Sequence, residues 1–179
     1  KAILSEAEFV KQSTYQRDRY EMVFKNILLK GVKFKSLVSN NGIEAESGSV
    51  QAGLKIFNDR TLPPDPKSKQ GKYPHQLLMK VAMPVFIKEL KINNSDVSYR
   101  ERSVLTEEIG HTFFTNLNAV ISNVTNMPEK IKQNAVCKLA ATTSILGKVT
   151  LSTQWDIQIN RQEGGVSARA QMEGLSASE

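Results

Sequence analysis

The stretch that decides the fold is VTLSTQWDIQIN, residues 149–160, in which two kinds of side chain alternate. The larger or apolar set is Val149, Leu151, Thr153, Trp155, Ile157 and Ile159, and polar residues occupy every position between them. Successive side chains of a β-strand point to opposite faces of the sheet. A period of two sustained over this length therefore predicts one long strand with a covered face and a wet face.

The same alternation continues on both sides of this strand. Downstream, the apolar positions from Val166 to Met172 follow a Gly164-Gly165 pair, which is typical of a hairpin loop. Upstream, alternation through Cys137 and Leu139 ends before Gly147, where a turn is expected. Residues 135–179 are therefore predicted to form a three-stranded antiparallel meander.

The rest of the chain also favours strands. Alternating segments run through residues 20–29, 43–56, 90–99 and 113–121. Within the third, Asn93-Asn94-Ser95-Asp96 has the composition of a turn. The fold class we predict is mainly β, with a long antiparallel, strongly twisted sheet or open trough.

One to three short helices are expected beside this sheet, at residues 34–39, 74–83 and 127–134, the last two with a proline near the start. The Pro- and Lys-rich residues 62–72 are predicted to be a mobile loop, and residues 1–19 are a candidate strand from a preceding unit. Because the chain begins at Lys1, we interpret residues 1–179 as a single β-rich segment of a larger protein.

Composition excludes several classes of function. The net charge is +6, but the basic residues are scattered, and aromatic residues make up only 7%. Single-stranded nucleic acid requires clustered aromatic and basic side chains, so no nucleic-acid partner is expected. The longest apolar stretch, Val81–Ile87, is far shorter than the roughly 20 residues of a membrane-spanning helix.

A search for reactive groups finds no catalytic motif. His75 and His111 have no partners at metal-ligand spacing, and Cys137 falls in the apolar phase of a strand, as a small buried hydrophobe would. A hydrolase based on Glu44 with Glu46, or on Asp59, is the weakest of the options. We therefore expect no enzyme, no catalytic residue, no metal and no cofactor.

What remains is an amphipathic sheet. Its inward apolar face is predicted to include Leu117, Ile121, Leu151, Trp155, Ile157 and Met172. Two interpretations stay open for these residues. They form either an ordinary packed core or the lining of a groove that holds acyl chains.

Three stretches together resemble a known family. They are FKNILLKGV at residues 24–32, YPHQLL at 73–78 followed by LKINNSDVSYRE at 90–101, and FFTNLNAVISNVTN at 113–126. The first and third share the pattern Phe-x-Asn-aliphatic, at residues 24–27 and 114–117, although two four-residue matches do not establish a repeat. Over residues 20–179 the chain resembles AsmA-like proteins of Gram-negative cell envelopes.

The resemblance implies an elongated β-sheet trough in the periplasm, anchored to a membrane by an N-terminal segment outside this sequence. It also implies a non-catalytic role in envelope biogenesis or phospholipid transport, with phospholipid or another acyl-chain lipid as partner. The alternative is a β-domain that binds a protein or glycan through edge strands and loops, with residues 58–72 and 100–110 as contact loops. The oligomeric state is not predicted by the sequence.

Overall fold

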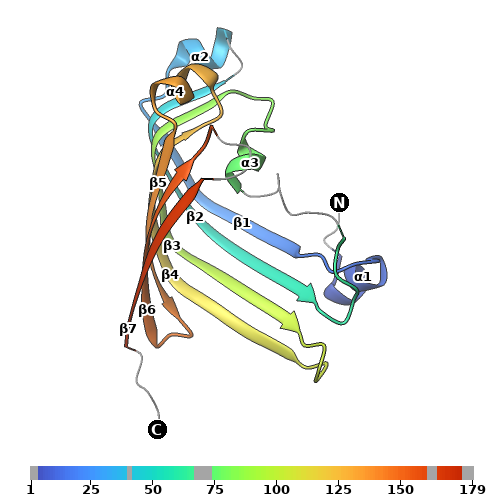
Figure 1. Cartoon of the computed structure of the whole chain (residues 1–179). Helices are drawn as coiled ribbons and strands as arrows, with labels where there is room; N and C mark the ends of the chain where they lie inside the picture. Colours follow the sequence, from blue (N-terminus) through green and yellow to red (C-terminus); the bar gives the residue numbers. More distant parts are fainter. Residues whose placement is uncertain (1–3, 40–41, 67–73, 161–164, 175–179) are drawn as a thin grey trace.

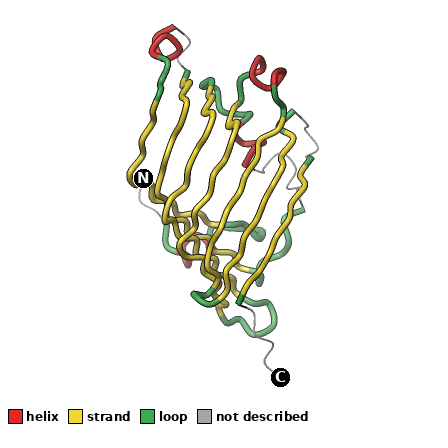
Figure 2. The backbone as a smooth tube through the Cα atoms, turned by 90° about the vertical axis from the view of Figure 1, so that its left-hand side faces the viewer, coloured by secondary structure: helices red, strands yellow, loops and turns green. Residues whose placement is uncertain are grey.

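A computed structural model describes residues 4–39, 42–66, 74–160 and 165–174. They form one curved sheet of seven strands in the order β1 to β7, not closed into a barrel (Figures 1 and 2). The strands are β1 (Arg19–Lys30), β2 (Ile43–Asp59), β3 (Val85–Arg102), β4 (Ile109–Thr125), β5 (Val136–Ile145), β6 (Val149–Gln158) and β7 (Val166–Glu173). The mainly β fold class is confirmed.

Four short helices precede or connect the strands. They are α1 (Glu6–Lys11), α2 (Phe34–Ser39), α3 (Pro74–Leu78) and α4 (Pro128–Gln133). Three match the predicted helices. The fourth, α1, overturns the prediction of a strand within residues 1–19, because Ser5 and Glu8 form a capping box that begins a helix there. Residues 62–66 contain no helix or strand, as expected, and residues 67–73 lie outside the described residues.

Neighbouring strands are antiparallel with one exception. β2 and β3 run parallel, from Ile43 opposite Val85 to Asp59 opposite Arg102. Two parallel neighbours need a connection that returns the chain to the starting end of the sheet, and residues 60–84 do this. The sheet is therefore mixed, whereas the sequence predicted it to be antiparallel. Within the described residues, the predicted meander is present as β5, β6 and β7, which pair antiparallel in sequence order, while part of the predicted Gly-Gly hairpin loop lies outside them.

Three of the long strands carry an extra residue. The pairing register shifts between Lys25 and Leu28 in β1, between Ile92 and Ser95 in β3, and between Thr115 and Asn118 in β4. Within these intervals Asn26, Asn94 and Asn116 have positive φ angles of 51°, 41° and 54°. Asparagine tolerates this left-handed conformation better than most residues, and such β-bulges bend a strand. The Phe-x-Asn-aliphatic pattern thus marks two bulges.

The turn predicted at Asn93–Asp96 is wrong for the same reason. The chain does not reverse there, because the extra residue of the bulge leaves β3 as one continuous strand. Elsewhere in β2, Gly48 and Ser49 keep the regular register with both neighbouring strands. A Cβ atom at Gly48 would lie 3.1 Å from side-chain atoms of both Leu29 and Leu90, so glycine leaves room for these two side chains.

Few apolar side chains are fully buried in this sheet. Among the described residues, the buried hydrophobic ones are Ala45, Phe57, Ala119 and Cys137 in the strands, with Met127 and Ile159 just outside them. The accessible surface is 12397 Å² for a 20.0 kDa chain. A compact monomer of this mass exposes about 8,700 Å². The described strands form a single layer, so much of the apolar sheet surface has no second layer packed against it (Figure 1).

Candidate functional site

The predicted apolar face assembles most fully on the last four strands. Ile121 is opposite Leu139, which is opposite Trp155, and the same row ends at Ala168 of β7. Directly opposed residues share one face of a sheet. On the same face, the next row joins Ile157 to Val166, and two rows away on the other side Leu151 is opposite Met172. Five of the six predicted residues therefore lie together on one face, as the alternation predicted.

The sixth residue, Leu117, lies apart from the others. It follows the bulge at Asn116 and pairs with Ser95 of β3, next to the point where the β4–β5 register shifts. Leu117 is half-buried and shares the face of Ala119 and Ile121 by alternation. It thus marks where the apolar face bends toward the first three strands.

The exposure of this face is intermediate between a core and an open surface. Trp155 is 39% exposed and Met172 is 52% exposed, while Ile121, Leu151 and Ile157 are half-buried by their neighbours. Packing within the sheet alone therefore leaves part of every large side chain near β7 in contact with solvent. That a ligand covers them stays a prediction.

The apolar face extends further than the sequence indicated. A second row of opposed residues runs from Met22 through Leu54 and Val97 to Phe114 and Ile145, and so crosses five strands. Met22 is 57% exposed, and its neighbours Tyr20 and Phe24 on β1 are also exposed. These positions alternate in the sequence, but they could be joined to the β5–β7 face only after the bulges fixed the register.

A polar seam runs along the bulges, and we define it by Asn26, Gln51, Asn94 and Asn118. Asn26 Nδ2 donates to Gln51 Oε1 at 3.0 Å, and Gln51 Nε2 donates to the Asn94 carbonyl at 3.1 Å. The backbone N–H of Asn94 donates to Asn118 Oδ1 at 3.1 Å. Each bulge removes regular ladder hydrogen bonds, and these amide side chains supply replacements across four strands.

The carboxylates considered for a hydrolase do not converge. Glu44 accepts from the Ser36 hydroxyl and from Lys33 Nζ, and the Ser36 hydrogen bond is the main cause of its lowered pKa. Glu46 pairs instead with Lys88 at 3.3 Å, and Asp59 lies at the far end of β2, 3.6 Å from an Arg102 nitrogen. These carboxylates belong to three separate ion pairs and not to one site.

Two further reactive groups, His111 and Cys137, lie on strands other than β2. Nε2 of His111 lies 2.8 Å from the Ser98 hydroxyl on an exposed part of β3 and β4. Cys137 is buried, as predicted, and burial raises the pKa of its thiol. Among the described residues, no three His, Cys, Asp or Glu side chains are grouped so that they could hold a metal ion.

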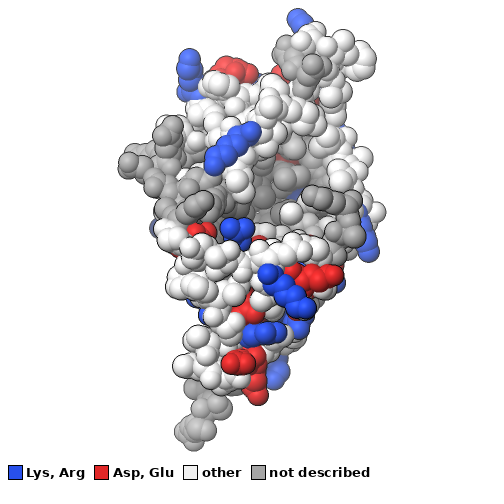
Figure 3. Space-filling view, turned by 90° about the vertical axis from the view of Figure 1, so that its right-hand side faces the viewer, with Lys and Arg blue, Asp and Glu red and all other residues white. Residues whose placement is uncertain are grey.

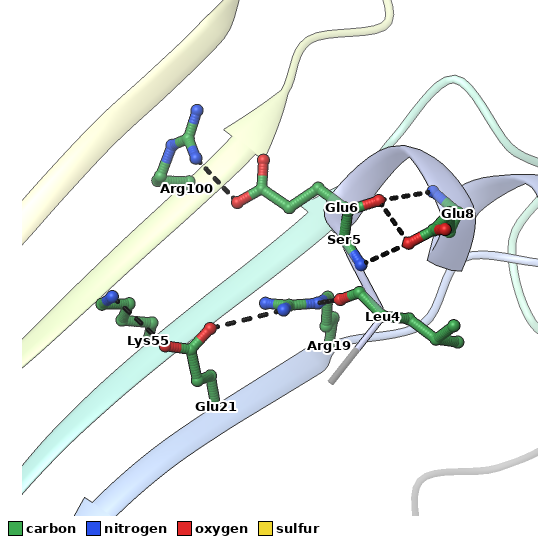
Figure 4. A network of polar contacts seen from close by, with 8 residues as sticks. All are labelled: Leu4, Ser5, Glu6, Glu8, Arg19, Glu21, Lys55 and Arg100. Carbon is green, nitrogen blue, oxygen red and sulfur yellow. Dashed lines mark hydrogen bonds and ion pairs between the residues drawn. The ribbon is translucent and has the colours of Figure 1, made fainter. Parts of the chain in front are cut away.

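Several ion pairs lie around α1, beside the start of β1 and the end of β3 (Figure 4). Glu6 of α1 accepts from Arg100 at 2.7 Å, and Arg19 donates both to the Leu4 carbonyl and to Glu21, which also pairs with Lys55. Acidic and basic side chains lie next to each other on the lower part of the face in Figure 3. These contacts fix the N-terminal segment against the sheet.

A cavity of about 940 Å³ lies at the same end of the molecule and is lined from both proposed contact loops. Leu62, Pro63 and Pro64 come from the first loop, and Val104 and Leu105 come from the second. Polar groups beside them are connected, because Glu101 accepts from the Tyr99 hydroxyl and from Arg60 Nε. The structure thus places side by side two loops that the sequence predicted to be contact loops, without predicting that they meet.

A second hollow, of about 790 Å³, crosses the middle of β3 to β7. The polar positions of β6 and β7 line it, among them Gln154, Arg169 and Gln171, together with Lys91 and Asn118. Alternation predicts that these positions lie on the solvent-exposed face of the sheet, but it does not predict the curvature that hollows this face.

No protein-family model matches this chain, and no curated protein matches its sequence. In the described part of the chain, no helix has the length and apolarity needed to cross a membrane. The class that fold and site define is therefore a mixed, open, single-layer sheet with one extended apolar face.

Proposed function

We propose that this chain is a non-catalytic segment of an AsmA-like cell-envelope protein that binds acyl chains along its apolar sheet face. The observation that carries the proposal is the continuous apolar face, which spans from Met22 to Met172 across seven strands and remains partly exposed. An exposed apolar surface of this extent is typical of a surface with a partner.

Acyl chains suit this face better than a polar ligand does. The central row through Ile121, Leu139 and Trp155 offers only apolar side chains. Covering apolar surface contributes roughly 25 cal/mol per Å², without any requirement for directed hydrogen bonds. A flexible hydrocarbon chain can follow the curvature that the bulges impose, and the polar seam then lies at the bend.

This interpretation places the protein in the periplasm, attached to a membrane by a segment outside the sequence, with a role in phospholipid transport or envelope biogenesis. Support for that location comes from the resemblance of residues 24–32, 90–101 and 113–126 to AsmA-like proteins. The open, elongated sheet is compatible with it.

Trp155 provides a direct test, since it is the only tryptophan in the chain. Vesicles of a phospholipid brominated in mid-chain should quench Trp155 fluorescence, because bromine would approach the indole along the apolar face. The matched control is the double variant Gln154→Trp/Trp155→Phe, which moves the indole to the exposed, opposite face of the same strand. This control should be quenched much less.

Equal quenching of the two proteins would contradict the proposal, because it would mean that lipid does not select the apolar face. Native mass spectra of the protein purified from membranes that show no bound phospholipid would also contradict the proposal. Vesicles of the same lipid without bromine give the Trp155 fluorescence in the absence of a quencher, which is the reference for both proteins.

A second candidate function is supported by the cavity between the two loops. Leu105 is 90% exposed beside the cavity, together with Val104, and exposed aliphatic side chains near a cavity are suited to binding a protein partner. A Leu105→Asp variant would lose a partner captured by the wild-type protein from an envelope extract. The same variant should leave lipid quenching of Trp155 unchanged, so the two functions can be separated.

A further inference from the structure

The helix α2, between β1 and β2, turns its apolar side chains outward. Phe34, Leu37 and Val38 lie three and four positions apart, so they form one stripe along the helix. All three are exposed, Phe34 to 77%, whereas Ser36 on the opposite side of the helix is buried. A surface helix normally buries its apolar stripe and exposes its polar residues. The orientation of α2 is therefore the reverse of the usual one.

Polar contacts on the inner side of α2 hold it in this orientation. The Ser36 hydroxyl donates to the Glu44 carboxylate at 2.5 Å, and the Ser36 carbonyl accepts from the N–H of Gly42 at 3.1 Å. Just before the helix, the N–H of Lys33 donates to the Glu44 carbonyl at 2.9 Å. These three bonds tie the helix to the start of β2, so the outward direction of Phe34 follows from the fold.

A second apolar segment lies at the same end of the sheet. The chain from α3 to β3 exposes four large apolar side chains, those of Leu77, Met79, Val81 and Met83. Asn126 Nδ2 holds this segment by donating to the carbonyls of Val81 at 2.9 Å and Met83 at 3.0 Å. The Pro84 carbonyl then accepts from the N–H of Ile43 at 2.8 Å. The segment thus reaches β3 next to the point where α2 leads into β2.

Lysines accompany these apolar side chains. We define the basic end by residues 32–39, 77–84 and 127–134, of which the first and last contain α2 and α4, side by side in Figure 1. These segments carry one carboxylate and five lysines: Glu129, Lys33, Lys35, Lys80, Lys130 and Lys132. Glu44 pairs with Lys33 at 3.0 Å and with Lys130 at 3.7 Å. Lys35 and Lys132 are exposed and have no ion pair with a described residue.

The opposite end of the sheet has apolar side chains of the other electrostatic setting. The turn between β3 and β4 exposes Val104 and Leu105. Exposed Glu107 and Glu108 follow them, and residues 103–108 contain no lysine or arginine. An anionic surface therefore attracts the basic end and repels this turn.

We propose that the basic end docks on the surface of a bilayer that contains anionic phospholipid. Phe34, Leu37 and Val38 enter the boundary between headgroups and acyl chains, while Lys35 and Lys132 contact lipid phosphates. Apolar side chains flanked by basic ones are the combination that binds such a surface. This contact does not require acyl chains to bind the sheet face, so it is independent of the function proposed above.

Tryptophan probes at the two ends of the sheet test where the bilayer binds. In a Trp155→Phe background, Phe34→Trp places the only indole on α2, and Leu105→Trp places it on the β3–β4 turn. The vesicles contain phosphatidylglycerol and phosphatidylcholine with brominated acyl chains. They should quench most of the fluorescence of the Phe34→Trp variant and little of that of the Leu105→Trp variant.

Cosedimentation with the same vesicles measures the strength of binding. Phe34→Glu should weaken binding at least about tenfold, because it replaces an inserted apolar side chain with an anion. Lys35→Glu should weaken it about tenfold, and only for vesicles that contain phosphatidylglycerol. Leu105→Glu makes the same kind of change at the opposite end and should bind like the wild type.

Three results would overturn the proposal. They are a wild-type protein that does not sediment with anionic vesicles, which would leave α2 to a protein partner, equal quenching of the two indoles, or equal affinities of Phe34→Glu and Leu105→Glu. The substituted side chains are exposed, so circular dichroism should show the wild-type fold for each variant. If Phe34→Glu fails to fold, Val38→Glu makes the same change on the same stripe.

Acyl-chain binding by the sheet face is measured separately. Phospholipid that co-purifies with the protein is detected by native mass spectrometry, and Phe34→Glu should leave its amount unchanged. Loss of vesicle binding with phospholipid retained, or the reverse, therefore shows which of the two proposals fails.

Discussion

The strands β1 to β4 differ from the strands β5 to β7 in how regularly they pair, although both groups belong to one amphipathic sheet. Three of the first four strands carry bulges at asparagines with positive φ, and a polar seam connects them. The meander keeps an unbroken register from Val136 opposite Gln158 to Thr150 opposite Glu173. Alternation therefore sets which face is apolar, while single inserted residues set where the sheet bends.

The largest expected difference between the halves is in packing. Phe57 is 2% exposed, and both residues opposite it, Arg19 and Arg100, contact the segment around α1. Phe57→Ala should lower the free energy of unfolding by about 3–5 kcal/mol, measured by urea denaturation. Trp155→Ala in the meander is the comparison, and its smaller loss reflects the exposure of Trp155. Equal losses would mean that the halves are equally packed.

The next effect concerns the hydrogen bonds of the bulge in β3. The Ser95 hydroxyl is buried, accepts from the Ala52 N–H at 2.8 Å and donates to the Asn93 carbonyl at 3.1 Å. Ser95→Ala leaves the Ala52 N–H without this acceptor and should cost about 1–3 kcal/mol in the same denaturation experiment. Ser152→Ala, on the exposed side of β6, should change stability by less than about 0.5 kcal/mol. A similar result for both serines would argue against a structural role for the bulge.

A smaller effect tests the backbone conformation alone. Asn94 has a φ of 41°, and in the polar seam it bonds through its backbone N–H and carbonyl. Asn94→Ala should destabilise the protein by about 1 kcal/mol, because alanine is strained at positive φ, whereas Asn94→Gly should be nearly neutral. Thermal unfolding of both variants gives the comparison. If glycine were as harmful as alanine, the asparagine side chain rather than its φ would be responsible.

The smallest effect is a dependence on alkaline pH that belongs to the β1–β4 half. Burial, followed by the hydrogen bond to Glu101, raises the pKa of Tyr99 to about 12. Between the ordinary value near 10 and this value, the folded state binds more protons than the unfolded state, so stability falls as pH rises. The Tyr99→Phe variant should lose less stability over this range. Absorbance titration of the tyrosines provides the control, since the variant should lack the highest step.

The meander and its apolar face were predictable from the sequence, because both follow from the alternation of side chains in adjacent strands. Trp155 and Ile157 were assigned to their face correctly, since nothing interrupts the period of two around them. The parallel β2–β3 pair was missed, because strand direction depends on the path of residues 60–84 and not on local pattern. The helix α1 was missed even though Ser5 and Glu8 supply a capping box that is readable in the sequence.

The bulges were missed for another reason. Asn93-Asn94-Ser95-Asp96 favours a turn by composition, and the same residue types also suit a bulge. Only the partner strands distinguish the two, because Ser95 pairs with Leu117 and bonds to Ala52 across the sheet. The part of the apolar face on β1 depends on these registers, so Met22 and Phe24 could not be connected to Trp155 beforehand.

The parallel contact between β2 and β3 has a consequence for how the chain assembles. β1 with β2, and β3 with the strands after it, each consist of sequence neighbours that can pair locally. Joining the two groups brings Ile43 to Val85, which requires closure of a long intervening loop before any pairing energy is gained. Pairing of β2 with β3 is therefore expected to be a late step of folding. In folding, the β1–β2 pair and the β3–β7 group would each form first, and each would then present the edge strand on which the other pairs.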